Sequence, residues 1–99
     1  MRVVMSMTLD AITPAQYEQL RKIVDWDGNI PKGAVFHVAG FDKNGIRVTD
    51  IWESEADCNN FVQSRLMPGV AQIGVTSQPK VEFYPVHAIF APGILQEAY

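Results

Sequence analysis

The stretch from Gly33 to Phe61 constrains the fold more than any other part of the chain. Two runs rich in β-forming residues, 35–39 and 46–52, flank the turn sequence Asp42-Lys43-Asn44-Gly45. Asn-Gly tolerates the positive φ angles of tight hairpin loops, whereas an aspartate three residues before a glycine suits a type I turn closed by a glycine bulge. Both signals predict a β-hairpin, but they predict different loop lengths.

The loop length decides which side chains share a face of this hairpin. A loop of two or four residues places His37 on the same face as Asp50 and Trp52. A loop of three residues places His37 with Ile51 instead, because a slip of one residue reverses the faces. The sequence leaves these alternatives open.

Two helices are predicted from their starting residues. Thr13 is a suitable N-cap, and Pro14 and Gln16 follow it as the first helical residue and the second half of a capping box. We expect this helix to end at Gly28 in the left-handed conformation, which glycine adopts readily. Ser54 is the predicted N-cap of the second helix. That helix should kink or restart at Pro68, which has no amide hydrogen to donate.

Residues 2–9 and 80–90 complete the pattern as the first and last strands. The order β-α-β-β-α-β predicts an α+β, ferredoxin-like sandwich with an antiparallel sheet of strand order 4-1-3-2. Pro85 supports this order, because proline is confined to edge strands or bulges and the fourth strand is an edge. The length of 99 residues indicates a single domain, residues 1–99.

The second strand predicts a homodimer, because it is apolar on both faces. Val35, Ala39 and Phe41 lie on one face, and Phe36 and Val38 lie on the other. Two helices cover only one face of a four-stranded sheet, and an exposed apolar edge favours association. We therefore expect a second copy to cover the open face.

Composition argues against several classes of partner. The net charge is -3 and the largest basic cluster is Arg21-Lys22, which disfavours a nucleic-acid-binding surface. No apolar run approaches the ~20 residues that span a bilayer. The single cysteine, Cys58, forms no internal disulfide and indicates a reducing, cytoplasmic compartment.

His37 is the main candidate for chemistry, as a general base within a strand. Asp50 would orient its imidazole if the hairpin loop is even; alternatively, Asp50 bonds a nearby backbone group or Arg65. His87, in the last strand, is a candidate ligand-binding or interface residue. The two histidines lack the close spacing of a metal site, so no metal is expected.

A resemblance to a known superfamily rests on four groups of residues: Phe36-His37-Val38-Ala39-Gly40, residues 47–54 (RVTDIWES), then Phe61 with Arg65-Leu66 and Pro68, and Tyr84-Pro85-Val86-His87. They are similar to small proteins of the dimeric α/β-barrel superfamily, which includes antibiotic-biosynthesis-monooxygenase-like domains. The haem-degrading branch uses an asparagine on the first strand, where this chain has Ser6 and Thr8. The resemblance therefore implies a homodimer with no cofactor.

Two function classes remain open. The first is a cofactor-independent monooxygenase or isomerase acting on a small aromatic or polyketide-like molecule. Its substrate would lie between the helices and the sheet near Tyr17, Trp52 and Phe61, with His37 as the base. The alternative is a non-catalytic dimer that binds a small hydrophobic ligand or serves a stress or regulatory role.

Overall fold

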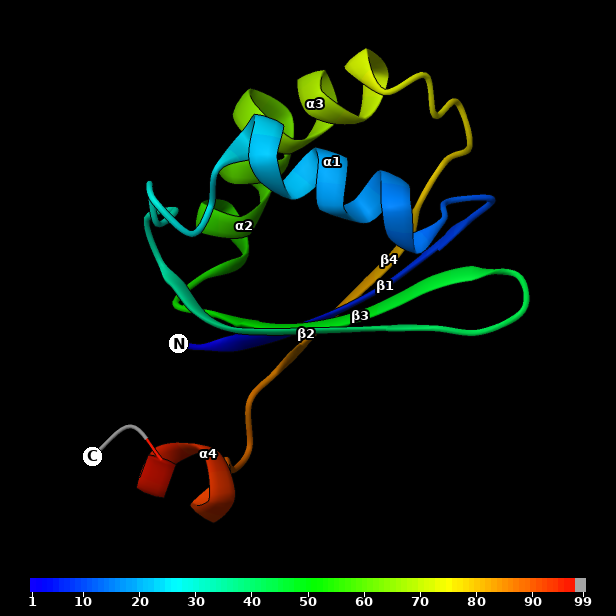
Figure 1. The fold of residues 1–99 in the computed structure, drawn as a ribbon. Helices are drawn as coiled ribbons and strands as arrows, with labels where there is room; N and C mark the ends of the chain where they lie inside the picture. The colour runs from blue at the N-terminus through cyan, green and yellow to red at the C-terminus, as the bar shows by residue number, and fades with distance from the viewer. Residues whose placement is uncertain (98–99) are drawn as a thin grey trace.

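The computed structural model describes the chain from residue 1 to residue 97, with side chains to Ile94. Its elements are β1 (Val3–Asp10), α1 (Pro14–Val24), β2 (Ala34–Phe41), β3 (Gly45–Trp52), α2 (Glu55–Phe61), the π-helical turn η1 (Val62–Leu66), α3 (Met67–Gln72), β4 (Lys80–Pro85) and α4 (Pro92–Glu97). The helices α1 to α3 cover one face of the sheet, and the other face is open (Figure 1).

The sheet is antiparallel with the order β2-β3-β1-β4. This is the predicted order 4-1-3-2 counted from the opposite edge, so the ferredoxin-like topology is confirmed. Pro85 lies at the end of the edge strand β4, where its missing amide hydrogen interrupts no inner ladder.

Four residues, 42–45, lie between the last paired residues of the hairpin formed by β2 and β3. Phe41 pairs with Ile46, and the same register places His37 opposite Asp50. The Asp42 carboxylate accepts the amides of Asn44 and Gly45 at 2.8 and 3.1 Å. Both hydrogen bonds hold the pKa of the Asp42 carboxyl below its usual value, and the bond from the Asn44 amide has the larger effect. The even loop is therefore the correct alternative.

Helix α1 begins as the sequence predicts. The Thr13 hydroxyl accepts the Gln16 amide at 3.1 Å, and the Gln16 side chain accepts the Thr13 amide at 2.9 Å. The predicted end at Gly28 is wrong, because Asp25 adopts the left-handed conformation with φ 54°. The Asp25 carboxylate accepts the amide of Gly28 at 3.2 Å, which stabilises the turn after that cap.

The second helical segment begins at its predicted cap, where the Ser54 hydroxyl accepts the Asp57 amide at 3.0 Å. The predicted restart at Pro68 is confirmed, because α3 begins at Met67 with the proline in its first turn. A π-helical turn precedes this restart, and the Met67 amide donates to the carbonyl of Val62 five residues earlier. This wider turn lets the chain continue past a residue that donates no backbone hydrogen bond.

The last strand is shorter than predicted, because β4 ends at Pro85 rather than Phe90. The Val86 amide donates to the carbonyl of Arg2 at 3.0 Å, beyond which β1 offers no partner. The chain leaves the sheet at this point and forms α4 (Figure 1). Residues 98–99 of the unassigned tail 94–99 lie outside the described residues.

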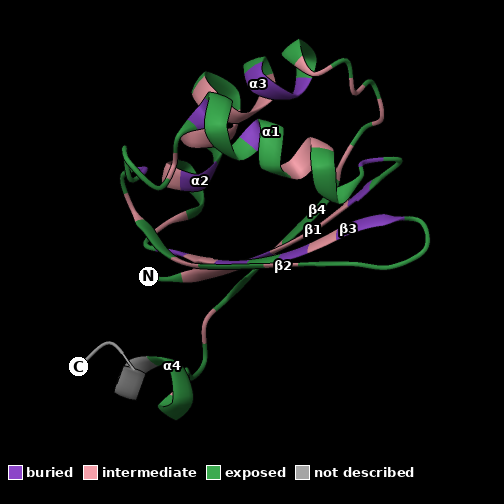
Figure 2. Ribbon diagram, viewed as in Figure 1, coloured by how far each residue is buried: buried purple, intermediate pink, exposed green. Residues whose placement is uncertain are grey.

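The core lies between the sheet and the helices. Buried residues gather on β1, β3 and the helix surfaces that face them, whereas β2 and β4 are mostly exposed (Figure 2). The main cluster joins Met5 and Leu9 of β1 to Val48 and Trp52 of β3 and to Cys58 of α2. Among residues 1–97, no helix is both long and apolar enough to cross a membrane.

Candidate functional site

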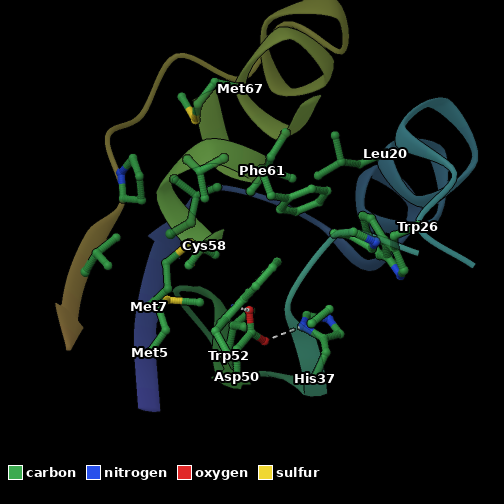
Figure 3. A pocket seen from close by; sticks show the side chains of 18 of the residues that line it. Met5, Met7, Leu20, Trp26, His37, Asp50, Trp52, Cys58, Phe61 and Met67 are labelled. Atoms are coloured by element: carbon green, nitrogen blue, oxygen red, sulfur yellow. Dashed lines mark hydrogen bonds and ion pairs between the residues drawn. The ribbon is translucent and has the colours of Figure 1, made fainter. Parts of the chain in front are cut away.

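A cavity of about 660 Å³ lies between the helices and the sheet. Sulfur-bearing side chains gather on one side of it, and Trp26, His37 and Asp50 lie on the other (Figure 3). The sulfur-bearing residues are Met5, Met7, Cys58 and Met67. The cavity is therefore an apolar chamber with a polar group at one end.

His37 and Asp50 form the centre of this polar group. They face each other across β2 and β3, and the imidazole Nδ1 lies 2.6 Å from the Asp50 Oδ1 (Figure 3). Asp50 is 7% exposed, whereas the His37 side chain is 37% exposed. A buried carboxylate needs donors on both of its oxygens, and the imidazole supplies one of them.

Trp52 supplies the other donor. Its indole Nε1 donates to the Asp50 Oδ2 at 3.0 Å, because residues two apart on a strand project from the same face. The carboxylate is therefore fixed on both sides. Because an ionised carboxylate only accepts hydrogen bonds, its contact with His37 assigns a proton to Nδ1.

Tyr17 extends the chain of hydrogen bonds from α1. Its hydroxyl oxygen lies 2.8 Å from the His37 Nε2. When the imidazole is neutral and carries its proton on Nδ1, Nε2 accepts this hydrogen bond and the tyrosine donates it. Burial raises the pKa of the Tyr17 hydroxyl above its usual value, partly offset by Arg21, so this donor stays protonated near neutral pH.

Trp26 also belongs to the site, although no pattern in the sequence predicted it. Its ring centroid lies 5.8 Å from that of His37 and 5.6 Å from that of Tyr17. The left-handed turn at Asp25 directs the chain back toward the sheet just before this residue. No local pattern in the sequence signals that return.

Phe61 lines the cavity, as the sequence analysis expected for a residue near the ligand. Its ring centroid lies 5.6 Å from that of Trp52, and the Arg65 guanidinium lies 5.2 Å from its centre. The alternative partnership between Asp50 and Arg65 is wrong. Arg65 donates instead to the carbonyls of Val24 and Asn29 at 2.9 and 2.8 Å, tying η1 to the end of α1.

Of the site residues predicted from the sequence, His87 alone does not line the cavity. It is exposed, follows the end of β4 and does not line the cavity. The reason is the early end of β4, after which the chain departs from the face that carries the cavity.

The charged side chains of the cavity wall are all acidic. Asp27 and Asp50 line it, whereas the described lining contains no lysine or arginine. Across residues 1–97, no group of three histidine, cysteine, aspartate or glutamate side chains is placed to hold a metal ion. Asp27 already accepts from Arg21 at 2.6 Å, so the described wall offers no free positive group to an anionic ligand and suits a neutral one.

Known protein structures resemble the fold of this chain. No protein-family model and no curated protein matches the sequence. A variant of SnoaB, a cofactor-independent oxygenase from Streptomyces nogalater, is similar with a TM-score of 0.61 at 12% identity, over 89% of this chain and 94% of that one. A dimeric ferredoxin-like protein of unknown function from Thermobifida fusca gives 0.59 at 15% identity, over 87% and 92%.

A hydroxynitrile lyase from Passiflora edulis gives a TM-score of 0.58 at 15% identity, over 90% of this chain and 97% of that one. These likenesses confirm the fold implied by the resemblance to antibiotic-biosynthesis-monooxygenase-like domains. They extend over nearly the whole chain, but at such identities they establish the fold alone. Oxygenase and lyase names occur together among them, so the fold alone does not select a reaction.

Proposed function

We propose that this protein is an enzyme that needs no cofactor and removes a proton from a small, largely aromatic substrate. The observation that carries the proposal is the hydrogen-bonded chain Tyr17–His37–Asp50–Trp52 at the polar end of an apolar cavity. A base that is oriented by a buried carboxylate and lies in the wall of a cavity is suited to general base catalysis on a bound substrate.

His37 is the proposed base, acting through Nε2. Asp50 holds the imidazole with its Nδ1 protonated, so the lone pair of Nε2 faces Tyr17. A substrate donor would take the place of the Tyr17 hydroxyl at 2.8 Å. The displaced hydroxyl would then donate to an oxygen of the substrate and stabilise the negative charge that forms there.

Proton removal is the step shared by the two reactions under consideration. In an isomerisation, the proton returns to a different atom of the same substrate. In a monooxygenation, the resonance-stabilised carbanion reduces dioxygen: a CH₂ group becomes a carbonyl group, one oxygen atom is retained and the other leaves as water. SnoaB is described as a cofactor-independent oxygenase, which favours this second reaction.

The alternative function is ligand binding without turnover. It is favoured by the contact between Tyr17 and His37, because the lone pair of the proposed base already accepts a hydrogen bond. In that case the polar group would select ligands by hydrogen bonding, and the apolar wall would supply most of the affinity.

A screen with matched histidine variants tests the proposal. Neutral polycyclic phenols and enols are tested for thermal stabilisation of the protein, and compounds that bind are then followed by oxygen consumption and by product analysis. His37→Ala should lose turnover, whereas His87→Ala should retain it because His87 lies away from the cavity. Binding without turnover in the wild-type protein would favour the alternative, and equal turnover in both variants would reject His37 as the base.

We also propose that the functional unit is a homodimer formed through the open face of the sheet. Val38 and Tyr84, which point away from the helices, are 49% and 46% exposed. The neighbouring side chains on this face include Val4 and Ile51, which adds to its apolar area. An interface that covers it should bury at least ~1,000 Å² in total.

A further inference from the structure

Arg65 extends from the π-helical turn η1 to the residues that follow α1, here called the 24–29 turn. Its Nη2 donates to the carbonyls of Val24 and Asn29 at 2.9 and 2.8 Å, and the Asp25 carbonyl lies 3.4 Å away. The last carbonyls of a helix have no partner within the helix, and a basic side chain can supply one. A single nitrogen of Arg65 therefore holds both ends of the 24–29 turn.

The guanidinium of Arg65 is itself held in place. It lies 5.2 Å from the centre of the Phe61 ring, a distance at which a cation is attracted to the face of an aromatic ring. The 24–29 turn has a second tie, the ion pair between Arg21 and Asp27, but these side chains are 45% and 57% exposed. Water weakens such a surface pair, so Arg65 supplies the stronger of the two ties.

The 24–29 turn carries Trp26, which contacts the proposed base. The Trp26 ring centroid lies 5.8 Å from that of His37 and 5.6 Å from that of Tyr17, at the polar end of the cavity (Figure 3). The bond to Asp50 fixes one imidazole nitrogen, but a single hydrogen bond leaves the ring free to pivot about it. The Trp26 and Tyr17 rings limit that movement, because they contact the imidazole on different sides.

Trp26 also lies in the wall between two hollows. An outer cleft opens between α1 and β2, and the residues that line both this cleft and the cavity are Tyr17, Trp26, Asp27 and His37. Movement of Trp26 would connect the cleft to the cavity beside His37 and admit water to the base. The position of Trp26 therefore affects both the orientation and the shelter of the imidazole.

We propose that Arg65 is a positioning residue for His37, acting through the 24–29 turn and Trp26. The inference rests on the proposed function and adds a residue outside the cavity wall, since Arg65 is not among the residues that line it. Single π-helical turns are frequent at functional sites, and the one in this chain carries Arg65. A displacement of a catalytic group by about 1 Å can lower a rate roughly a hundredfold, so a remote tie of this kind affects turnover.

Arg65→Met tests the role in the full-length chain, with a phenol or enol that the wild-type protein converts in the screen above. The value of kcat should fall at least tenfold while KM changes less than threefold, because the cavity wall that binds the substrate keeps its residues. The nuclear Overhauser effect between the ring protons of Trp26 and His37 should be lost. Unchanged kcat with this signal intact would overturn the inference.

Arg47→Met is the matched control. It also removes an arginine that donates to a backbone carbonyl, that of Ile46 at 3.0 Å, but Arg47 does not line the cavity. It should keep kcat within twofold of wild type and keep the signal between the two rings. Arg65→Lys should restore both properties in large part, because one nitrogen makes all the contacts with the 24–29 turn and an ammonium group can replace it.

A double-mutant cycle shows whether Arg65 acts through Trp26. Trp26→Ala should lower kcat by about as much as Arg65→Met, and the double variant should lose no more than a further twofold. Losses that multiply would show that Arg65 acts by another route and would overturn the inference. Trp26→Ala alone decides the matter if Arg65→Met does not fold, since unchanged kcat in that variant would also overturn it.

The failure of the proposed function and the failure of the positioning role give different results. A wild-type protein that converts no substrate, with the ring signal lost in Arg65→Met and kept in Arg47→Met, rejects the enzyme and retains the hold of Arg65 on Trp26 and His37. Turnover that Arg65→Met preserves rejects the positioning role alone.

Discussion

His37 and Asp50 stand opposite each other on neighbouring strands, with the imidazole Nδ1 2.6 Å from the carboxylate Oδ1. The pairing leaves His37 partly open to solvent while Asp50 is buried. The carboxylate therefore controls which ring nitrogen carries the proton, and the exposed imidazole presents the other nitrogen to Tyr17.

Replacement of the carboxylate should reverse the tautomer of His37. In Asp50→Asn, a single amide oxygen remains to accept, and the amide hydrogens face either the Trp52 indole or the His37 Nδ1. We expect the imidazole proton to move to Nε2, and the free energy of unfolding to fall by ~1–3 kcal/mol. Nitrogen NMR of the labelled histidine reports the tautomer, and an unchanged Nδ1–H signal would contradict this account.

The Trp52 indole should matter more as a hydrogen-bond donor than as a cavity wall. Trp52→Phe removes the donor to Asp50 and leaves a buried carboxylate oxygen without a partner. We expect a loss of at least ~1–3 kcal/mol in the free energy of unfolding, measured with urea.

Trp26→Phe is the control for this loss, because it makes the same change in the same site. Trp26 is half-buried, and its indole nitrogen donates no hydrogen bond in the described part of the chain. Its loss should be limited to weaker aromatic contacts, worth about 1 kcal/mol or less. Equal losses in the two variants would show that the bond to Asp50 adds nothing to stability.

Helix caps provide a test of the features that were predictable from local sequence. Thr13→Ala and Ser54→Ala each remove the acceptor of a first-turn amide, so each should lower the free energy of unfolding by ~1 kcal/mol. Ser64→Ala is the control, since its hydroxyl donates to a carbonyl within the helical segment and serves no cap. Unchanged denaturation midpoints for both cap variants would show that these side chains do not stabilise the helix starts.

Both helix caps and the β2–β3 hairpin were predictable because each depends on neighbouring residues, and the strand order was predictable from the order of the elements along the chain. The hairpin loop length was not, because Asp42 and Gly45 fit more than one turn until the register with the rest of β3 is fixed. The end of β4 depends on a distant segment. Its apolar pattern continues to Phe90, but β1 begins at Val3 and offers no further partner.

The candidate site also contains residues that local sequence patterns predicted and one residue that they did not. Because the hairpin loop has an even number of residues, strand alternation places His37, Asp50 and Trp52 on the same face of the sheet. The helical spacing of α1 places Tyr17 above that face, next to His37. Trp26 reaches the site only through the turn at Asp25, where a non-glycine residue takes a positive φ. That choice is set by the packing of the whole loop, which a local sequence pattern does not contain.

Cys58 should be chemically silent in the native protein. Burial, with added repulsion from Asp50 and Glu55, raises the pKa of its thiol to about 12. The thiolate is the reactive form, so iodoacetamide at pH 8 should modify Cys58 only after the chain is unfolded in urea. Mass spectrometry of native and unfolded samples measures this, and rapid native alkylation would show that the α2 region opens readily.

The raised pKa of Cys58 also predicts how stability depends on pH. An unfolded thiol ionises near roughly pH 8.5, whereas the native thiol stays protonated to about pH 12. Between these values the unfolded state binds fewer protons, so stability should fall as the pH rises, by up to about 1.4 kcal/mol per pH unit. Cys58→Ala should remove this contribution, and identical slopes for Cys58→Ala and wild type between pH 9 and about pH 11 would contradict the assignment.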